Sequence, residues 1–238
     1  MNNLAELRSH AEPGAWTPPQ PARPTAAPTP APATAKPAAA KEATSRRKRA
    51  FDVVMAFGAL MVFLPLLLTI ALLVRLESPG AALFRQRRTG LNGRIFTVYK
   101  FRTMTVAEDG DVVRQATRED ARVTRLGAVL RKFSLDELPQ FINVLKGDMS
   151  LIGPRPHAVA HDEAWSESVP GYDLRFRARP GLTGYAAVSG FRGEVRELQA
   201  IIDRVKSDNE YIDTWSFGLD MKIIWRTLPL IFADERAY

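Results

Sequence analysis

The chain has 238 residues, with 33 Lys and Arg, 26 Asp and Glu, and a formal net charge of +7 at pH 7. It contains no cysteine, which excludes disulfides, thiolate catalysis and thiolate metal sites. Of its three histidines, only His157 and His161 have i, i+4 spacing, and a zinc site would need a third ligand. The composition therefore favours an oxygen-ligated Mg²⁺ over zinc as a metal partner.

Residues 1–45 are rich in proline and alanine and are predicted to form a disordered tail. They hold 9 of the 17 prolines and 13 alanines, with almost no large apolar side chains to build a core. Residues 1–49 carry a net charge of +5, so the rest of the chain is close to neutral. Because no nucleic-acid-binding motif is visible, we predict no nucleic-acid partner, and we interpret the RRKR cluster at 46–49 as a contact with anionic membrane lipids.

Residues 46–76 are predicted to form a basic flank and a membrane-inserted helix. The run from Val53 to Val74 has 22 residues without a charge, about 33 Å as a helix. Length alone favours a spanning helix, with a buried core helix as a weaker alternative. Pro65 divides the run, and both flanks are basic, so the positive-inside rule favours a re-entrant helix kinked at Pro65 over a spanning one. Residues 77–238 would then form one domain on the cytosolic face.

Two apolar, basic segments flank the glycine-rich stretch 89–93 and predict a small β-hairpin. The alternation of a strand places Lys100 and Arg102 on one face of its second strand. The polar residues 104–118 are predicted to form a loop, and the amphipathic spacing of residues 122–133 predicts a helix that leads into the next motif.

That motif is SLDELPQFINVLKGDMSLIGPRP, at residues 134–156. Ser134 and Glu137 have the spacing of a capping box, and apolar residues recur at helical spacing as far as Gly147. We therefore predict that a helix begins at the acid pair Asp136 and Glu137, where its backbone N–H groups would keep both carboxylates ionised. An ionised carboxylate can act as a nucleophile or bind a hard cation, although an isolated S-x-D-E sequence usually marks only a good helix start.

The acid pair has basic neighbours in the sequence, namely Lys100, Arg102, Arg131 and Arg155. Pro154 and Pro156 restrict the backbone on both sides of Arg155 and so direct its side chain. A guanidinium fork suits a pair of phosphate oxygens better than the point charge of lysine does. Each of these residues alone would be read as a solvated surface charge, but their combination indicates phosphate chemistry.

Beyond Pro156 the sequence predicts a helix, then three arginines before the rigid turn at 180–184, and a charged helix over 194–211. Residues 215–232 are apolar with Lys222 and Arg226 interspersed, as in a helix that lies in a membrane interface, although ordinary domain packing explains both helices equally well. The predicted fold class is therefore α+β and helix-dominated, a single domain with one membrane helix, a small β-hairpin and interfacial amphipathic helices.

From Lys48 to Thr227 the chain resembles the bacterial polyprenol-phosphate phosphoglycosyl transferases, the monotopic sugar transferase family. The resemblance is carried, in order, by K-R-x-x-D, Pro65, FRQRRTGLNGRIFTVYKFRTM, SLDELPQFINVLKGDMSLIGPRP, RPGLTG and D-x-x-Y-x-x-x-W-S-x-x-x-D-x-K. The stretches PRPHAVAHDE and VSGFRGEVREL are most similar to the branch that transfers glucose 1-phosphate. The chain departs from the family pattern at Leu64, where some members have serine, and at Phe176, where histidine is common.

The resemblance implies that Asp136 attacks the β-phosphate of a UDP-sugar, releases UMP and holds the sugar phosphate until undecaprenyl phosphate displaces it. It implies that Glu137 binds Mg²⁺, and it assigns substrate binding to Lys100, Arg102, Arg131, Pro154, Arg155, Pro156 and Arg192. It also implies the re-entrant helix, contact with membrane lipids and a location on the cytoplasmic face of the bacterial inner membrane, and it allows a homodimer. UDP-glucose is the predicted donor, with UDP-galactose second.

Two other functions compete with this one. A glycosidase needs two carboxylates about 5 to 9 Å apart across a glycosidic bond, which neighbours in one helical turn supply poorly. A catalytically inactive membrane scaffold for polysaccharide assembly would explain the membrane segment, the tail and the basic surface. It gives no reason for Asp136, Glu137 and Arg155 to occur together.

Overall fold

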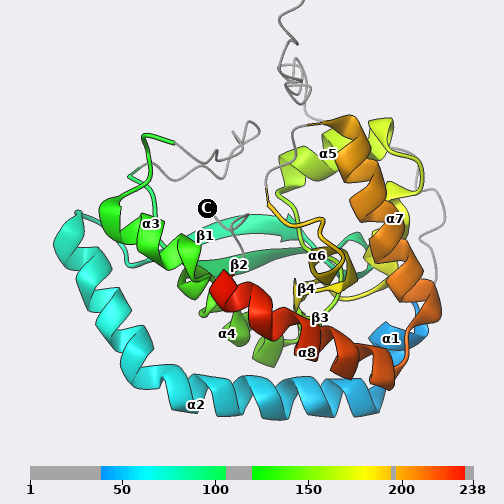
Figure 1. Ribbon diagram of the computed structural model, residues 1–238, viewed down its shortest axis with the longest axis horizontal. Coiled ribbons are helices and arrows are strands. Elements are labelled where there is room, and N and C mark those ends of the chain that lie inside the picture. Colours follow the sequence, from blue (N-terminus) through cyan, green and yellow to red (C-terminus); the bar gives the residue numbers. More distant parts are fainter. Residues whose placement is uncertain (1–38, 106–119, 194–196, 234–238) are drawn as a thin grey trace, which may run out of the picture.

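The computed structural model describes residues 39–105, 120–193 and 197–233 and shows a helix-rich domain around two small β-sheets (Figure 1). The predicted α+β, helix-dominated class is confirmed. A long bent helix, α2 (Arg46–Glu77), runs beneath the domain and then rises along one side of it. Residues 1–38 of the predicted tail and most of the predicted loop at 104–118 lie outside the described residues.

The end of the predicted disordered tail is ordered, so the boundary at residue 45 is too late. α1 (Lys41–Thr44) packs against the domain, and Glu42 and Ala43 are buried. The guanidinium of Arg179 donates a hydrogen bond to the carbonyl of Ala43 at 2.6 Å. This contact depends on a residue more than 130 positions away, which is why the composition of the tail did not reveal it.

Helix α2 is continuous across Pro65, its one proline. Proline lacks the N–H that would complete the helical ladder, so it is the expected cause of the bend that Figure 1 shows in the middle of the helix. Within the described residues α2 is the one helix that is long and apolar enough to cross a membrane, and only 11% of its most apolar stretch is buried. Its outward apolar side chains include Val54, Phe57, Val62, Leu68 and Leu72.

Polar contacts fasten the N-terminal end of α2 to the domain. Lys48 Nζ lies 2.8 Å from Asp220 Oδ2 in α8 (Phe217–Ala233). Arg49 donates to the carbonyls of Val144 at 2.6 Å and Leu145 at 2.9 Å, at the C-terminal end of α4 (Gln140–Lys146). The carbonyl of Val144 also accepts from the N–H of Gly147 at 3.1 Å, and Arg49 adds a second donor there and one for Leu145, so it helps to cap α4.

The C-terminal end of α2 is fastened to the same domain. Glu77 Oε1 accepts a hydrogen bond from the N–H of Leu126 at 2.8 Å, in the first turn of α3 (Arg125–Lys132). Arg102 donates to the carbonyls of Ser78 at 2.7 Å and Pro79 at 2.6 Å. Both ends of the apolar helix are therefore tied to one globular domain.

The predicted β-hairpin is confirmed. β1 (Leu83–Thr89) and β2 (Ile95–Phe101) pair antiparallel with Leu83 opposite Phe101 and Thr89 opposite Ile95. The short 3₁₀ turn η1 (Leu91–Gly93) connects them, with Asn92 and Gly93 in the left-handed region. The turn residues were read correctly because asparagine and glycine accept a positive φ at low cost.

A second, parallel pair of strands was not predicted. β3 (Ser150–Ile152) pairs with β4 (Gly181–Thr183), and each has three residues, too few for a periodic pattern. The remaining elements are η2 (Leu135–Glu137), α5 (Val159–Ser168), η3 (Tyr172–Arg177), α6 (Tyr185–Val188) and α7 (Leu198–Thr214). The predicted helices at 122–133, 194–211 and 215–232 are confirmed as α3, α7 and α8, each beginning two to four residues later than predicted.

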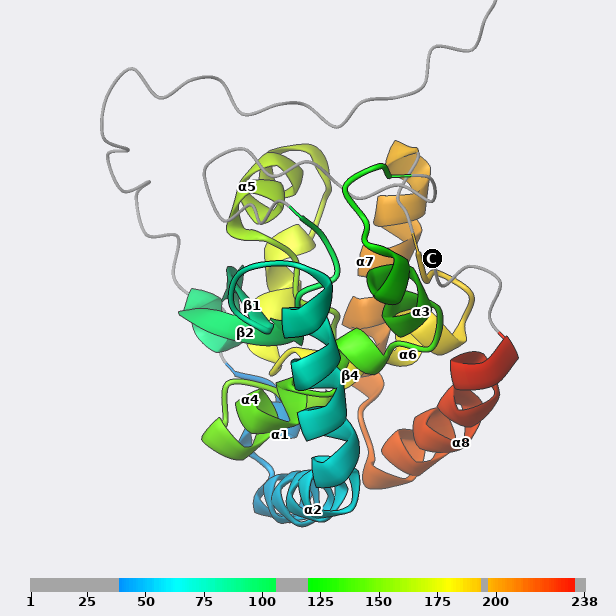
Figure 2. The ribbon, with the colours of Figure 1, turned by 90° about the vertical axis from the view of Figure 1, so that its left-hand side faces the viewer.

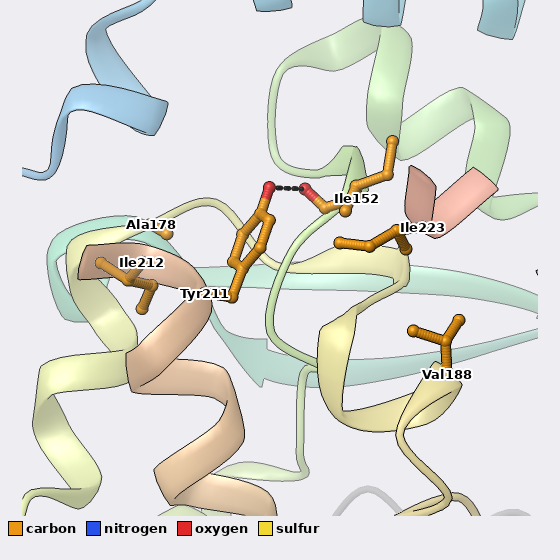
Figure 3. Close-up of a cluster of buried hydrophobic side chains, with 6 residues drawn as sticks. All are labelled: Ile152, Ala178, Val188, Tyr211, Ile212 and Ile223. Atoms are coloured by element: carbon orange, nitrogen blue, oxygen red, sulfur yellow. Dashed lines mark hydrogen bonds between the residues drawn. The ribbon is translucent and has the colours of Figure 1, made fainter. Parts of the chain in front are cut away.

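Helices α6, α7 and α8 pack against β3 through a core cluster made of Ile152, Ala178, Val188, Tyr211, Ile212 and Ile223 (Figure 3). The hydroxyl of Tyr211, from α7, lies 3.3 Å from the carbonyl oxygen of Ile152. Turned by 90° (Figure 2), the molecule shows α8 on one side and the hairpin with α4 on the other, above the N-terminal part of α2. The strand β3, which leads into the Pro-Arg-Pro sequence, is thus fixed from several directions.

Candidate active site

The acid pair Asp136 and Glu137 lies in a short 3₁₀ turn and not at the start of an α-helix. This turn, η2 (Leu135–Glu137), follows Ser134, whose φ is +55°, and α4 begins only at Gln140. The Ser134 side chain makes no capping hydrogen bond, so the predicted capping box is wrong. One reason is local, because Pro139 has no N–H and interrupts the ladder that a helix starting at residue 135 would need. The other is that the Ser134 hydroxyl accepts a hydrogen bond from the distant Arg192.

Two cations converge on Glu137. Lys100 Nζ lies 2.7 Å from Glu137 Oε1, and Arg155 Nη2 lies 2.6 Å from the same oxygen. Lys100 Nζ is also 3.9 Å from Asp136 Oδ2. The Asp136 side chain is 11% exposed and that of Arg155 is 48% exposed, so the cluster is open to solvent on the arginine side. Residues from β2, η2 and the Pro-Arg-Pro sequence therefore form one charged site.

The two neighbouring carboxyl groups have opposite electrostatic environments. Burial raises the pKa of Asp136 to about 6; Lys100 opposes this rise and the charge of Glu137 adds to it. Burial would also raise the pKa of Glu137, but the adjacent Arg155 and Lys100 hold it well below its usual range. With these pKa values both carboxylates are still mostly ionised at neutral pH, as the sequence predicts. The cause differs from the one expected, because burial and the local cations, not a helix start, decide the two pKa values.

Arg131 and Arg192 also lie at the acid turn. Arg131, in the last turn of α3, is close enough to Asp136 to lower its pKa. Arg192 donates to Ser134 Oγ at 2.6 Å and to the carbonyl of Leu230 at 3.1 Å, which ties the acid turn to α8. Its contacts are those of a residue that holds the turn in place, while its expected substrate contact stays a prediction.

Arg102, which was grouped with Lys100 in the sequence, is directed elsewhere. Its guanidinium donates to carbonyls at the end of α2, those of Val74, Ser78 and Pro79, at 3.2, 2.7 and 2.6 Å. Lys100 and Arg102 are two positions apart, but β2 ends at Phe101, so strand alternation no longer fixes the side chain that follows. Lys100 therefore lies at the acid pair, whereas Arg102 caps the apolar helix α2. Pro65 also lies in α2 and not at the acid pair.

The Pro-Arg-Pro sequence is held by its backbone carbonyls. The carbonyl of Pro154 accepts from the N–H of Gly181 at 2.9 Å, and that of Pro156 accepts from Arg88 Nη1 at 2.9 Å. Between them, the carbonyl of Arg155 accepts from Arg175 Nη2 at 2.6 Å. Every residue of the turn thus has a fixed backbone, and the side chain of Arg155 projects from it toward Glu137.

Glycines allow this turn to approach the RPGLTG motif. A Cβ on Gly153 would collide with the carbonyl of Arg179, and a Cβ on Gly181 would collide with the backbone of Gly153. The Pro-Arg-Pro turn and the RPGLTG motif therefore approach each other backbone to backbone at the β3 and β4 pair. This close approach leaves no room for a Cβ atom and explains the glycines in both motifs.

The sequence reasoning missed the buried groups behind the turn. Arg175 was read as one of three similar arginines before the turn at 180–184, yet it is buried while Arg177 is partly exposed. Its Nε lies 2.9 Å from Asp208 Oδ2 in α7. Burial of both Arg175 and its partner Asp208 distinguishes this pair from Arg177 and Asp213, and the sequence carries no local signal for that.

The described residues contain no group of three or more His, Asp or Glu side chains arranged to hold a metal ion. His157 points into the domain, 2.6 Å from the hydroxyl of Tyr172, and burial lowers the pKa of His157 well below its usual value.

The sequence of residues 43–234 matches the family model described as bacterial sugar transferase. The chain belongs to the bacterial sugar transferase family. A family relative from Caulobacter vibrioides, named UDP-glucose:undecaprenyl-phosphate glucose-1-phosphate transferase, is 53% identical over 196 residues, or 82% of this chain and 73% of that protein. A protein of the same name from Escherichia coli K12 is 50% identical over 191 residues, or 80% of this chain and 41% of that protein.

A further member from Rhizobium leguminosarum bv. phaseoli, the exopolysaccharide production protein PSS, is 45% identical over 185 residues, or 76% of this chain and 92% of that protein. This bacterial sugar transferase therefore spans nearly the full length of some relatives and about two fifths of the Escherichia coli relative. The matched region contains the acid turn, Lys100 and the Pro-Arg-Pro turn.

Proposed function

We propose that the protein transfers glucose 1-phosphate from UDP-glucose to undecaprenyl phosphate with release of UMP, and so begins exopolysaccharide or O-antigen synthesis. The observation that carries the proposal is the open cluster of Asp136, Glu137, Lys100 and Arg155 in a member of the bacterial sugar transferase family. The names of the relatives from Caulobacter vibrioides and Escherichia coli support the choice of glucose and of the lipid acceptor.

In the first step, a carboxylate oxygen of Asp136 attacks the β-phosphorus of UDP-glucose. A new P–O bond forms to Asp136, the bond between the β-phosphorus and the oxygen that bridges the two phosphates breaks, and UMP leaves with that electron pair. The product is an acyl phosphate that carries glucose. A pKa of about 6 suits this role because Asp136 is mostly ionised near neutral pH while remaining more basic than an ordinary aspartate.

In the second step, a phosphate oxygen of undecaprenyl phosphate attacks the same phosphorus atom. The P–O bond to Asp136 breaks, the carboxylate is regenerated, and the product is undecaprenyl diphosphoglucose. Neither step requires an oxidant or a reductant. Two in-line displacements at one phosphorus need a nucleophile that also leaves readily, which a carboxylate supplies.

Charge balance at the site supports binding of a diphosphate. Lys100, Arg131 and Arg155 surround two carboxylates, a surplus of one positive charge before any substrate arrives. Phosphoryl transfer depends mainly on positioning and on neutralising the negative charge of the phosphates. The planar fork of Arg155 can leave Glu137 and take two phosphate oxygens without moving its fixed backbone.

The donor set suits a Mg²⁺ ion that shares its ligands with the substrate. Glu137 stays anionic because its cationic neighbours lower its pKa, and Mg²⁺ is commonly held by one or two carboxylates together with substrate phosphates and water. Glu137 would hold the ion, which would neutralise phosphate charge when bound. We expect EDTA to abolish UMP release and added Mg²⁺ to restore it.

We further propose that α2 is a re-entrant helix in the bacterial inner membrane, with the domain on the cytoplasmic face in contact with membrane lipids. The support is that both ends of α2 are tied to one domain while its middle exposes apolar side chains. Undecaprenyl phosphate, held in the membrane, and a soluble nucleotide sugar would then meet at one surface. A spanning helix would place its two ends on opposite sides.

The topology can be tested by labelling single cysteines, since the chain has none of its own. With Ser45→Cys and Asn92→Cys introduced separately, a membrane-impermeant maleimide should label both positions from the cytoplasmic side of inverted vesicles. Labelling of the two positions from opposite sides would overturn the re-entrant helix.

The function is tested by UMP release from purified protein in nanodiscs given undecaprenyl phosphate, Mg²⁺ and each of several UDP-sugars. UDP-glucose should give UMP, and UDP-galactose, the second donor expected from the sequence, is the comparison. Release of UDP would indicate ordinary glycosyl transfer. No release from any donor would favour the catalytically inactive scaffold. The homodimer allowed by the family resemblance is a separate question, answered by light scattering of the same preparation.

A further inference from the structure

We propose that Arg175 and Asp208 are positioning residues that aim Arg155 at the phosphates by holding the backbone carbonyl of Arg155. The inference rests on the proposed phosphoglycosyl transfer, to which it adds two residues that do not themselves touch substrate. Its basis is that one buried guanidinium makes three different contacts, one of them to the Pro-Arg-Pro turn.

Each nitrogen of the Arg175 guanidinium has its own partner. Nε lies 2.9 Å from Asp208 Oδ2, Nη1 lies 3.1 Å from His157 Nδ1, and Nη2 lies 2.6 Å from the carbonyl oxygen of Arg155. The guanidinium carbon also lies 5.0 Å from the centre of the Tyr172 ring. A lysine ammonium at this position would be a single point and could not reach three partners in the same plane.

The three carbonyls of the Pro-Arg-Pro turn are not held equally. The carbonyl of Pro154 is bonded to a backbone N–H across the short parallel sheet, and that of Pro156 to the side chain of Arg88. The carbonyl of Arg155, the residue whose side chain faces Glu137, depends on Arg175. Loss of this contact would let the peptide that carries Arg155 rotate, and with it the direction of the guanidinium fork.

A buried ion pair is a poor way to gain stability, because the cost of removing both charges from water offsets their attraction. Arg175 and Asp208 are nevertheless both buried. The chain also holds a comparison, because Arg177 and Asp213 join the same two elements, η3 and α7, at 2.8 Å on the exposed side. Within the described residues, the side chains of that second pair form no hydrogen bond or ion pair with the Pro-Arg-Pro turn, so it is a matched control for the buried one.

The test is a double-mutant cycle on UMP release. Arg175→Lys alone should slow release about tenfold or more, since small misplacement of a phosphate-binding group is costly. Arg155→Ala removes the side chain but keeps the carbonyl that Arg175 holds. If Arg175 acts through Arg155, adding Arg175→Lys to Arg155→Ala should cost less than about twofold more. Arg177→Lys should leave release unchanged. Losses that multiply in the double variant would overturn the proposal.

A measurement that needs no substrate separates this inference from the proposed function. Amide hydrogen exchange of peptides covering residues 153–158 should speed up in Arg175→Lys and stay unchanged in Arg177→Lys. Should Arg175→Lys fail to fold, Asp208→Asn, which removes the charged partner and keeps Arg175, takes its place in both experiments. Unchanged exchange would overturn the positioning role, whereas a wild-type protein that releases no UMP would instead overturn the proposed function.

Discussion

This molecule contains two separate clusters in which a lysine lies beside two acidic side chains, and the clusters differ in their exposure to solvent. The first consists of Lys48, Glu42 and Asp220 and joins α2 to α8; we call it the base cluster because it lies where α2 runs beneath the domain. Its side chains are at most 2% exposed. The acid cluster, Lys100, Asp136, Glu137 and Arg155, is reached by solvent from the side of Arg155. In the base cluster Lys48 also faces the hydroxyl of Tyr211 at 3.4 Å, so its ammonium is enclosed by protein.

Enclosure and charge balance distinguish a cluster that stabilises the fold from one that can bind a substrate. The base cluster is closed, with one cation between two acids, and burial raises the pKa of Glu42 to about 7. The acid cluster is open and has cations in excess when Arg131 is included, so an anion can enter and complete it. Both clusters contain a lysine beside two acids. The two clusters differ in their exposure and charge balance, not in the presence of charge.

Removing the carboxylate of Asp136 should have the largest effect on activity. Asp136→Asn is expected to lower UMP release by about 10³-fold or more, because an amide cannot act as the nucleophile. The variant should be at least as stable as the parent, since it removes a buried charge whose pKa is raised by burial. The measurement is UMP release together with the thermal midpoint in detergent; Asp148→Asn, on a partly exposed residue outside the site, is the control.

The base cluster should respond in the opposite way. Lys48→Met leaves Asp220 buried without its cation and is expected to destabilise the protein by about 3 kcal/mol or more. The protein that remains folded should keep its rate of UMP release. Denaturation in detergent measures the loss, with Lys41→Met at an exposed lysine as the matched control. A stable Lys48→Met variant with a large loss of turnover would contradict the division into structural and functional clusters.

The sequence predicts local features of this fold well. The glycine-rich stretch 89–93 between two apolar, basic segments predicts the hairpin, the length of the apolar run predicts α2, and the patterns of apolar and charged residues predict α3, α7 and α8. Each of these depends on interactions between near neighbours. The acid turn was misread as a helix start because Ser134 adopts a left-handed backbone and its hydroxyl accepts from Arg192, 58 positions away.

The candidate site shows the same limit. Lys100, Arg131 and Arg155 were rightly placed near the acid pair, although Arg155 follows Glu137 by 18 positions and Lys100 precedes it by 37. That success came from motif resemblance and from proline chemistry. Arg102 was wrongly grouped with Lys100, and Arg175 was not distinguished, because the direction and burial of a side chain depend on contacts between distant elements.

The pH dependence of the first step should expose the unusual pKa of Asp136. Folding raises the pKa of Asp136 to about 6, so its reactive carboxylate form is lost as the pH falls through about 6. UMP release in the absence of the lipid, where only the first step operates, should fall about tenfold between pH 7 and pH 5. Leaving out the lipid removes the titration of its phosphate. A rate that is constant to pH 5 would mean that Asp136 ionises as an ordinary aspartate.

The smallest expected effect is a shift in that titration caused by Glu137. The charge of Glu137 raises the pKa of Asp136, and Glu137 also engages Lys100 and Arg155, which both favour ionised Asp136. Glu137→Gln should therefore lower the pKa of Asp136, first by removing a like charge and second by releasing two cations toward it. Carbon-13 NMR of labelled aspartate carboxyls measures this without substrate or metal, so a loss of activity in the variant cannot obscure the result. Asp136 should be assigned by its absence in Asp136→Asn. An unchanged or raised pKa would show that burial alone sets the value, and that the two neighbouring carboxylates do not act as an electrostatically coupled pair.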